Sequence, residues 1–186
     1  MDVPLSGWKR KLHLFFTWWL RWTVIGWYGT VVDVTKHDED DTDYSKYLGP
    51  DWKKNKFKGK RVSTIVSNHI GFLEIVAFMS TFELPPAFVA AHFIRNFPIG
   101  RSYISALQGI YANRASGKEE LEKAVKQITD RQELIETSEH EYAPLCIFAE
   151  GSQTNGLNIS RFRRGAFIGN YALNPVMIKF DCKTVT

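Results

Sequence analysis

The sequence predicts an α/β fold in which a partly parallel sheet is flanked by helices, preceded by helices that associate with a membrane. From residue 62 onward, short apolar runs typical of buried strands alternate with segments of helical periodicity. The 186 residues are 44% hydrophobic, which is enough for one domain with a substantial core. We expect three parts: membrane-anchoring helices in 1–35, a charged connecting loop in 36–61, and the α/β domain in 62–186.

The N-terminal part is rich in tryptophan, with five of the six tryptophans in the first 27 residues. A basic cluster at 9–11 precedes an apolar stretch, 12–34, that is long enough to span a bilayer. Arg21 lies near its middle, where a cation costs about 2.5–3.5 kcal/mol on insertion scales. Tryptophan favours the headgroup region. We therefore expect one or two helices that lie in, or dip into, one leaflet.

A narrow polar stripe runs along the same segment, because its polar side chains recur at three- and four-residue spacing. The stripe consists of Arg10, His13, Thr17 and Arg21. Gly26 and Gly29 are candidates for a break between two helices. The alternative interpretation is a single core helix of a soluble domain.

The connecting part carries two opposite charge clusters. Residues 37–43 are acidic and are typical of a loop, whereas residues 53–61 are strongly basic. The basic segment is either a solvated surface loop or a contact with anionic headgroups or nucleotide phosphates. Across the whole chain the net charge is +4, a mild preference for anionic partners.

The α/β part contains five expected strands and three expected helices. The best helix begins with a capping box formed by Ser116 and Glu119 and has one apolar face. The expected strands are 62–66, 87–92, 109–112, 144–149 and 175–180, and the expected helices are 71–82, 101–107 and 116–136.

The first expected strand leads to a histidine and a carboxylate, His69 and Glu74. Five residues separate them, about 140° around a regular helix, so they meet easily only if His69 lies in the turn before the helix. There the positive end of the helix favours a neutral ring. A neutral histidine held by a carboxylate at its other nitrogen can accept a proton from a hydroxyl group.

Two later segments carry further polar groups. Residues 148–152 follow a strand and contain Glu150, Gly151 and Ser152, in which glycine permits a close approach and the other two can hydrogen-bond hydroxyl or phosphate oxygens. The strand at 109–112 is followed by Arg114, a residue type that binds phosphate in a bidentate manner. Each of these segments, taken alone, also has an ordinary structural interpretation as a turn or a surface ion pair.

In order and spacing, the segments resemble the glycerolipid (lysophospholipid) acyltransferase family. This family carries a His-x4-Asp box usually preceded by Asn, a strand ending in arginine, a Phe-Pro-Glu-Gly-Thr box and a proline-containing strand. The matching segments here are 68–74, 109–114, 148–152 and the strand at Pro175. Residues 154–156 and 162–167 look closest to the lysophosphatidylcholine and glycerol-3-phosphate acyltransferase branch.

The resemblance implies transfer of an acyl group from acyl-CoA, a cosubstrate, to a hydroxyl of a lysophospholipid or glycerol phosphate. It implies that His69 is the general base and Glu74 its orienting carboxylate. Arg114 would contact the acceptor phosphate. Further substrate-binding positions implied by the resemblance are Asn68, Glu150, Gly151, Ser152 and Pro175.

A second hypothesis is a non-catalytic accessory subunit that binds lipid within a larger membrane protein complex. Two departures from the family motivate it: Glu74 stands where the family has Asp, and family members normally continue beyond the strand at Pro175. An occluded histidine box would support the subunit, and an open groove at His69 would support the enzyme.

The cysteine content and the motifs that the sequence lacks limit the cofactors, partners and cellular location that we expect. Cys146 and Cys182 are the only cysteines and form neither a disulfide framework nor a metal site, so we expect reduced thiols, no metal and no other cofactor. No nucleic-acid recognition module is present. We expect an intracellular, membrane-associated protein, on endoplasmic reticulum or mitochondrial membrane, whose partners are acyl-CoA, phospholipid and the membrane surface.

Overall fold

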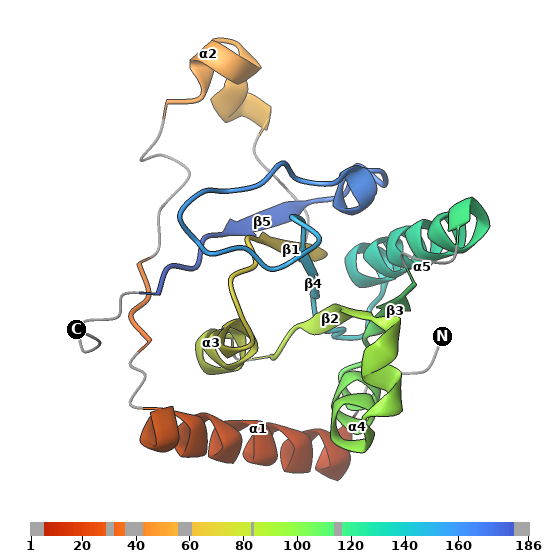
Figure 1. The fold of residues 1–186 in the computed structure, drawn as a ribbon. Coiled ribbons are helices and arrows are strands. Elements are labelled where there is room, and N and C mark those ends of the chain that lie inside the picture. Colours follow the sequence, from red (N-terminus) through yellow and green to blue (C-terminus); the bar gives the residue numbers. More distant parts are fainter. Residues whose placement is uncertain are drawn as a thin grey trace.

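The computed structural model describes residues 6–28, 32–35, 43–55, 61–82, 84–113 and 117–180. Its centre is a five-stranded sheet with the strand order β3-β2-β4-β1-β5 (Figure 1). The strands are β1 Thr64–Ser67, β2 Ala87–Ala91, β3 Ile110–Ala112, β4 Leu145–Phe148 and β5 Leu173–Val176. The helices are α1 Gly7–Tyr28, α2 Ser45–Leu48, α3 Leu73–Thr81, α4 Pro98–Ala106 and α5 Gly117–Thr137, with short 3-10 helices η2 Trp52–Asn55, η3 His92–Asn96 and η4 Arg164–Ala166.

All four strand pairings of the described residues are parallel. The expected α/β class is therefore confirmed, and the sheet is parallel throughout instead of partly parallel as expected. The physical reason lies in the connections. Parallel neighbours need a crossover that returns the chain to the same end of the sheet, and α3, α4 and α5 lie in such crossovers. A parallel sheet is covered on both faces, which explains the nearly continuous apolar runs of its strands.

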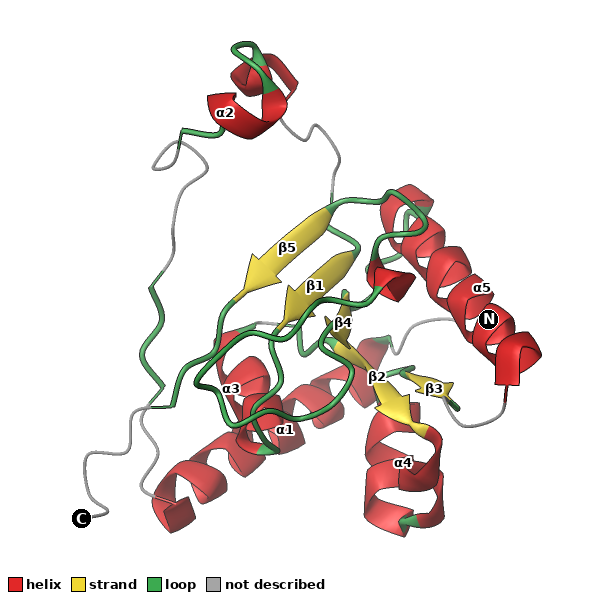
Figure 2. Ribbon diagram, turned by 45° about the horizontal axis from the view of Figure 1, so that its top comes forward, coloured by secondary structure: helices red, strands yellow, loops and turns green. Residues whose placement is uncertain are grey.

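Helices cover both faces of the sheet, as Figure 2 shows. On one face, α5 and η4 contribute Ile128, Ile135 and Ala166 to a core with strand residues such as Val66. On the other face, α3 and α4 contribute Phe78 and Ile104 to a second core. Adjacent strand residues alternate between the cores, because successive side chains of a strand point to opposite faces.

Helix α1 packs against α3 and forms an outer layer beyond the α3–α4 face (Figure 1). The described side chains of its polar stripe, Arg10, His13 and Thr17, turn toward the protein. Thr17 is only 5% exposed, and Arg10 forms an ion pair of 2.7 Å with Glu141 in the loop before β4. The outward side carries large apolar residues that are about half exposed or more, namely Trp8, Leu12, Phe15, Phe16, Trp18, Trp19 and Trp22. An ordinary surface helix turns its apolar side toward the core and its polar side toward solvent, and α1 does the reverse.

A single helix runs through Gly26, so the candidate break does not occur there, and Gly29 lies outside the described residues. Glycine lowers helix stability by only about 1 kcal/mol and does not by itself end a helix. No helix within the described ranges is long and apolar enough to cross a membrane. Most of the acidic cluster at 37–43, residues 56–60 of the basic one, and Ser116 of the expected capping box also lie outside the described residues.

The last strand differs most from its expected position. The apolar run predicts a strand over 175–180, whereas β5 covers Leu173–Val176 and pairs with β1 in the register Pro175↔Val66. Beyond Val176 the strand ends, because the backbone N–H and the carbonyl of Ile178 are both hydrogen-bonded to the Asn68 side chain and not to a neighbouring strand. Proline is accommodated because β5 is an edge strand.

Candidate active site

The candidate site lies at the carboxyl ends of the strands. His69 follows β1 by two residues, and Glu150 follows β4 by two residues. His92 follows β2 directly, and Asn113 follows β3 directly. Because the strands are parallel, these positions meet at one edge of the sheet, where ligands of open α/β folds bind.

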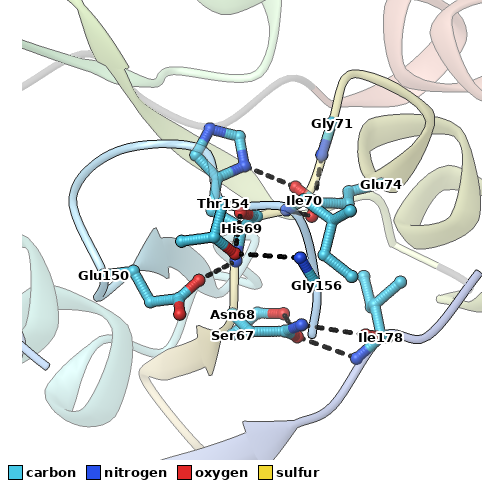
Figure 3. Close-up of polar contacts among 10 residues, drawn as sticks. All are labelled: Ser67, Asn68, His69, Ile70, Gly71, Glu74, Glu150, Thr154, Gly156 and Ile178. Carbon is cyan, nitrogen blue, oxygen red and sulfur yellow. Dashed lines mark hydrogen bonds and ion pairs between the residues drawn. The ribbon is translucent and has the colours of Figure 1, made fainter. Parts of the chain in front are cut away.

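His69 and Glu74 form the central contact of the site. His69 lies in the turn before α3, as the sequence spacing predicts, and its Nδ1 is 2.6 Å from Glu74 Oε2 (Figure 3). The Glu74 side chain is fully buried, whereas the His69 side chain is 22% exposed. A carboxylate accepts from Nδ1–H, so this contact fixes the ring tautomer and leaves Nε2, on the far side of the ring, able to accept a proton.

The second oxygen of Glu74 holds the backbone of the same turn. Glu74 Oε1 accepts hydrogen bonds from the backbone N–H of Ile70 and from that of Gly71 at 3.2 Å. Glu74 also occupies the first turn of α3, where the helix dipole favours a negative charge. The longer side chain therefore does reach the histidine, because the turn folds back over the helix start.

Glu150 and Asn68 tie this turn to two other segments of the chain (Figure 3). Glu150 Oε2 accepts from the backbone N–H of His69 at 2.6 Å, and its Oε1 accepts from the backbone N–H of Ser160 at 2.6 Å. Asn68 donates from Nδ2 to the Ile178 carbonyl and accepts from the Ile178 N–H, both at 2.8 Å. Both side chains are nearly buried, so they position backbone at the edge of the site.

The loop after β4 closes over the histidine turn. The backbone N–H of Thr154 donates to the His69 carbonyl at 2.8 Å, and the Thr154 hydroxyl donates to the same oxygen at 3.3 Å. Gly156, at φ +74°, lies against Ile70, where an added Cβ would be 3.1 Å from Ile70 Cδ1. A side chain at this position would meet both backbone strain and a steric contact.

An aromatic stack fixes the plane of the histidine ring. The ring of His69 stacks on Phe148 with centroids 4.3 Å apart and planes 13° apart. Phe148 in turn stacks on Phe88 at 6.1 Å. The imidazole ring of His69 is thus held by a hydrogen bond at one edge and by an aromatic ring against its face, and both contacts restrict its rotation.

A cavity of about 510 Å³ opens at the exposed side of His69. Its walls come from η3, from the ends of β2 and β3, and from the turn after β4. The lining residues are His69, Val89, Ala91, His92, Phe93, Asn96, Ala112, Asn113, Phe148, Gly151 and Ser152. A lining of apolar residues with a few polar side chains is typical of small-molecule sites.

The cavity brings together only some of the residues singled out in the sequence. His69, Gly151 and Ser152 line it. Glu74, Asn68 and Glu150 lie behind the histidine turn and hold it, and Pro175 lies on the edge strand β5. Arg114 lies outside the described residues, although its neighbour Asn113 lines the cavity.

Several residues that line the cavity were not named as site residues from the sequence, among them the polar side chains His92 and Asn96. The signal for His92 was present, since a histidine directly after a parallel strand lies at the same edge as His69. Phe148 belongs to the 148–152 segment that matches the family's Phe-Pro-Glu-Gly-Thr box, but its stacking on the histidine ring was not predicted, because an apolar residue at the end of a buried strand is ordinary core composition.

The charge of Glu74 also acts on a neighbouring core residue. Burial, and secondarily the Glu74 carboxylate, raise the pKa of the fully buried Cys146 thiol well above its usual range. This thiol is therefore a core side chain and a poor nucleophile. Among the described residues no group of three or more potential ligands is placed to hold a metal ion.

Comparisons with known proteins agree with this geometry. A family model described as Acyltransferase matches residues 53–179. The lysophospholipid acyltransferase LPEAT2 of Arabidopsis thaliana is 32% identical over 181 residues, which cover 96% of this chain and 30% of that protein. LPEAT1 of the same plant is 29% identical over 122 residues, 65% of this chain and 30% of that protein. A lysophosphatidylcholine acyltransferase of Drosophila melanogaster is 26% identical over 119 residues, 64% of this chain and 21% of that protein.

This chain spans less than a third of the length of these relatives. No solved structure matches it. The family match covers more than half of the chain and includes every strand of the sheet, together with the turn that joins His69 to Glu74. The resemblance inferred from the ordered motifs is confirmed: the chain belongs to the acyltransferase family.

Proposed function

We propose that the chain forms the catalytic part of a membrane-associated acyltransferase that esterifies a lysophospholipid, or a glycerol phosphate, with an acyl group from acyl-CoA. The observation that carries the proposal is the 2.6 Å contact between His69 Nδ1 and Glu74 Oε2 beside an open cavity. The relatives named as lysophospholipid acyltransferases support the choice of acceptor.

The chemistry follows from the free nitrogen of His69. Nε2 accepts the proton of the acceptor hydroxyl while the hydroxyl oxygen attacks the thioester carbonyl carbon. Collapse of the tetrahedral intermediate breaks the carbon–sulfur bond, and the departing thiolate of CoA takes the proton back from His69. Glu74 keeps the ring in the required tautomer and stabilises the imidazolium that forms between these two steps.

The orientation of α1 supports association with a membrane. Its tryptophan-rich side faces away from the protein, whereas Arg10 and Thr17 of the polar stripe face inward. Tryptophan is enriched at membrane–water interfaces, and a helix with one broad apolar side can lie in the plane of that interface. The lipid acceptor would then be taken from the same bilayer that holds the helix.

The alternative, a lipid-binding accessory subunit, has less support. Its expected sign is a filled or covered histidine box, whereas His69 faces a cavity of about 510 Å³. The substitution of Glu for Asp, which motivated it, still permits a short contact with the histidine. We keep it as an outcome of the test below.

The test is an acyl-transfer assay with radiolabelled acyl-CoA and a panel of lysophospholipids and glycerol phosphates. We expect wild type to transfer the label and His69→Ala to lose transfer by at least about a thousandfold. His140→Ala is the matched control, because this exposed histidine lies in the loop before β4. Equal absence of transfer in wild type and His69→Ala over the whole panel would refute the enzyme and favour the subunit.

A further inference from the structure

A second surface, separate from α1, is exposed at the mouth of the cavity. It consists of two phenylalanines, Phe93 in η3 and Phe97 at the start of α4, which are 60% and 58% exposed. Their rings contact each other edge to face, with centroids 6.4 Å apart. Adjacent exposed aromatic rings of this kind mark interaction surfaces more often than isolated ones do.

The segment that carries the pair is firmly anchored. Between the two phenylalanines, Ile94 packs against the core formed by α3, α4 and the sheet. Gly100 allows this packing, because a Cβ there would be 2.9 Å from Ile94 Cγ2. The two rings therefore face outward on a fixed support.

The same segment forms a wall of the candidate site. Phe93 lines the cavity beside His69, together with its neighbours His92 and Asn96. Whatever contacts the exposed side of Phe93 thus lies next to the cavity. A bilayer in contact with Phe93 would therefore lie next to the cavity.

The charge around the pair indicates an anionic partner. Residues 84–118 contain four cations and no acidic residue. Of these, Arg95 lies between the two phenylalanines in the chain and Arg101 lies one turn into α4, and both are exposed. Exposed cations beside aromatic rings match the negative surface of a bilayer, at about 1 kcal/mol per cation near the surface.

We propose that Phe93 and Phe97, with Arg95 and Arg101, form a second membrane contact that places the mouth of the cavity against the anionic headgroups of a bilayer. This inference rests on the proposed membrane-associated function. It adds that α1 is not the sole contact, and that the orientation of the site toward lipid depends on η3. Burial of the exposed part of one phenylalanine contributes about a fivefold gain in partitioning.

The experiment measures co-sedimentation of the chain with vesicles of phosphatidylcholine alone and of phosphatidylcholine with 30% phosphatidylserine. We expect Phe97→Ala to lower binding to the anionic vesicles about fivefold, and Arg95→Gln to lower it less and only at low salt. The matched control is Phe167→Ala, since Phe167 is also exposed but adjoins η4 on the α5 side of the sheet. Thermal unfolding of each variant verifies folding.

A labelled variant reports the contact directly. In a Cys182→Ser background, an environment-sensitive fluorophore at Phe97→Cys should shift to the blue with anionic vesicles, and one at Phe167→Cys should not. Binding of Phe97→Ala equal to that of wild type, without a shift at position 97, overturns the proposal. A dimer that Phe97→Ala abolishes, with vesicle binding unchanged, would also overturn it in favour of self-association. Vesicle binding does not require catalysis, so failure here is distinguishable from failure of acyl transfer.

Discussion

Replacement of Glu74 by glutamine separates the two tasks of this buried carboxylate. In Glu74→Gln the side-chain oxygen can still accept from the backbone N–H of Ile70 and Gly71, so the turn is expected to keep its shape. The amide NH2 then faces His69 Nδ1 and can only donate. The ring must present Nδ1 as an acceptor, which puts its hydrogen on Nε2 and removes the base.

The size of the effect follows from what is lost. A hydrogen bond to a charged group contributes about 1.5–3 kcal/mol, which is about 10- to 150-fold in rate. The equivalent Asp→Asn change in a serine-protease triad costs about 10⁴-fold through the wrong tautomer. We therefore expect kcat/KM of Glu74→Gln to fall by about 10²- to 10⁴-fold, measured by acyl transfer to a lysophospholipid.

A control variant and a second substitution at position 74 accompany this measurement. Glu122→Gln makes the same chemical change on an exposed side chain of α5 and should leave both rate and melting temperature unchanged. Glu74→Asp withdraws the carboxylate from Nδ1 by more than 1 Å, and a displacement of that size costs about a hundredfold. A Glu74→Gln enzyme within threefold of wild type, with an unchanged melting temperature, would refute the assignment of His69 as the base.

Two other predictions concern positioning and pH. The Glu150 carboxylate accepts hydrogen bonds from the backbone N–H groups of His69 and Ser160. In Glu150→Gln we therefore expect kcat to fall at least about tenfold with an unchanged KM for the acceptor. A raised acceptor KM with an unchanged kcat would show direct substrate binding instead. His13 has its pKa lowered from 6.5 by burial, and its Nε2 has no hydrogen-bond partner among the described residues. Its neutral form therefore stabilises the fold above pH 6.5, and that stability is lost as the pH falls below 6.5 toward the lowered pKa. Melting temperatures at pH 7.5 and 5.5 should differ less in His13→Leu than in wild type, and an equal difference in both would contradict this assignment.

What the sequence predicts well here is local. The contact between His69 and Glu74 joins residues five apart, so a strand, a turn and a helix start were enough to bring them together. The apolar cores likewise follow from runs that alternate between two faces. These features depend on neighbours in the chain, and their periodicity is visible in one segment at a time.

The sequence does not predict the hydrogen bonds between side chains and backbone groups that lie far apart in the chain. Glu150 and Asn68 hold backbone groups 81 and 110 residues away. No side-chain pattern records such a partner, because any residue supplies an N–H and a carbonyl. The same reason explains the misplaced last strand, which ends where Asn68 takes over the backbone of Ile178. The stripe on α1 was visible, but which side faces the protein is decided by α3 and by Glu141.

The clamp between Asn68 and Ile178 also sets an order of assembly during synthesis. At about 5–20 residues per second, the histidine turn is made roughly 5–20 s before the residue that it binds. During that interval β1 has no β5 beside it and presents an unpaired edge, the kind of surface that invites pairing with other chains. β5, the last strand among the described residues, covers the edge of β1 and is followed by the residue that Asn68 binds, so β1 of a nascent chain stays unpaired on that side until the segment up to position 178 has left the ribosome.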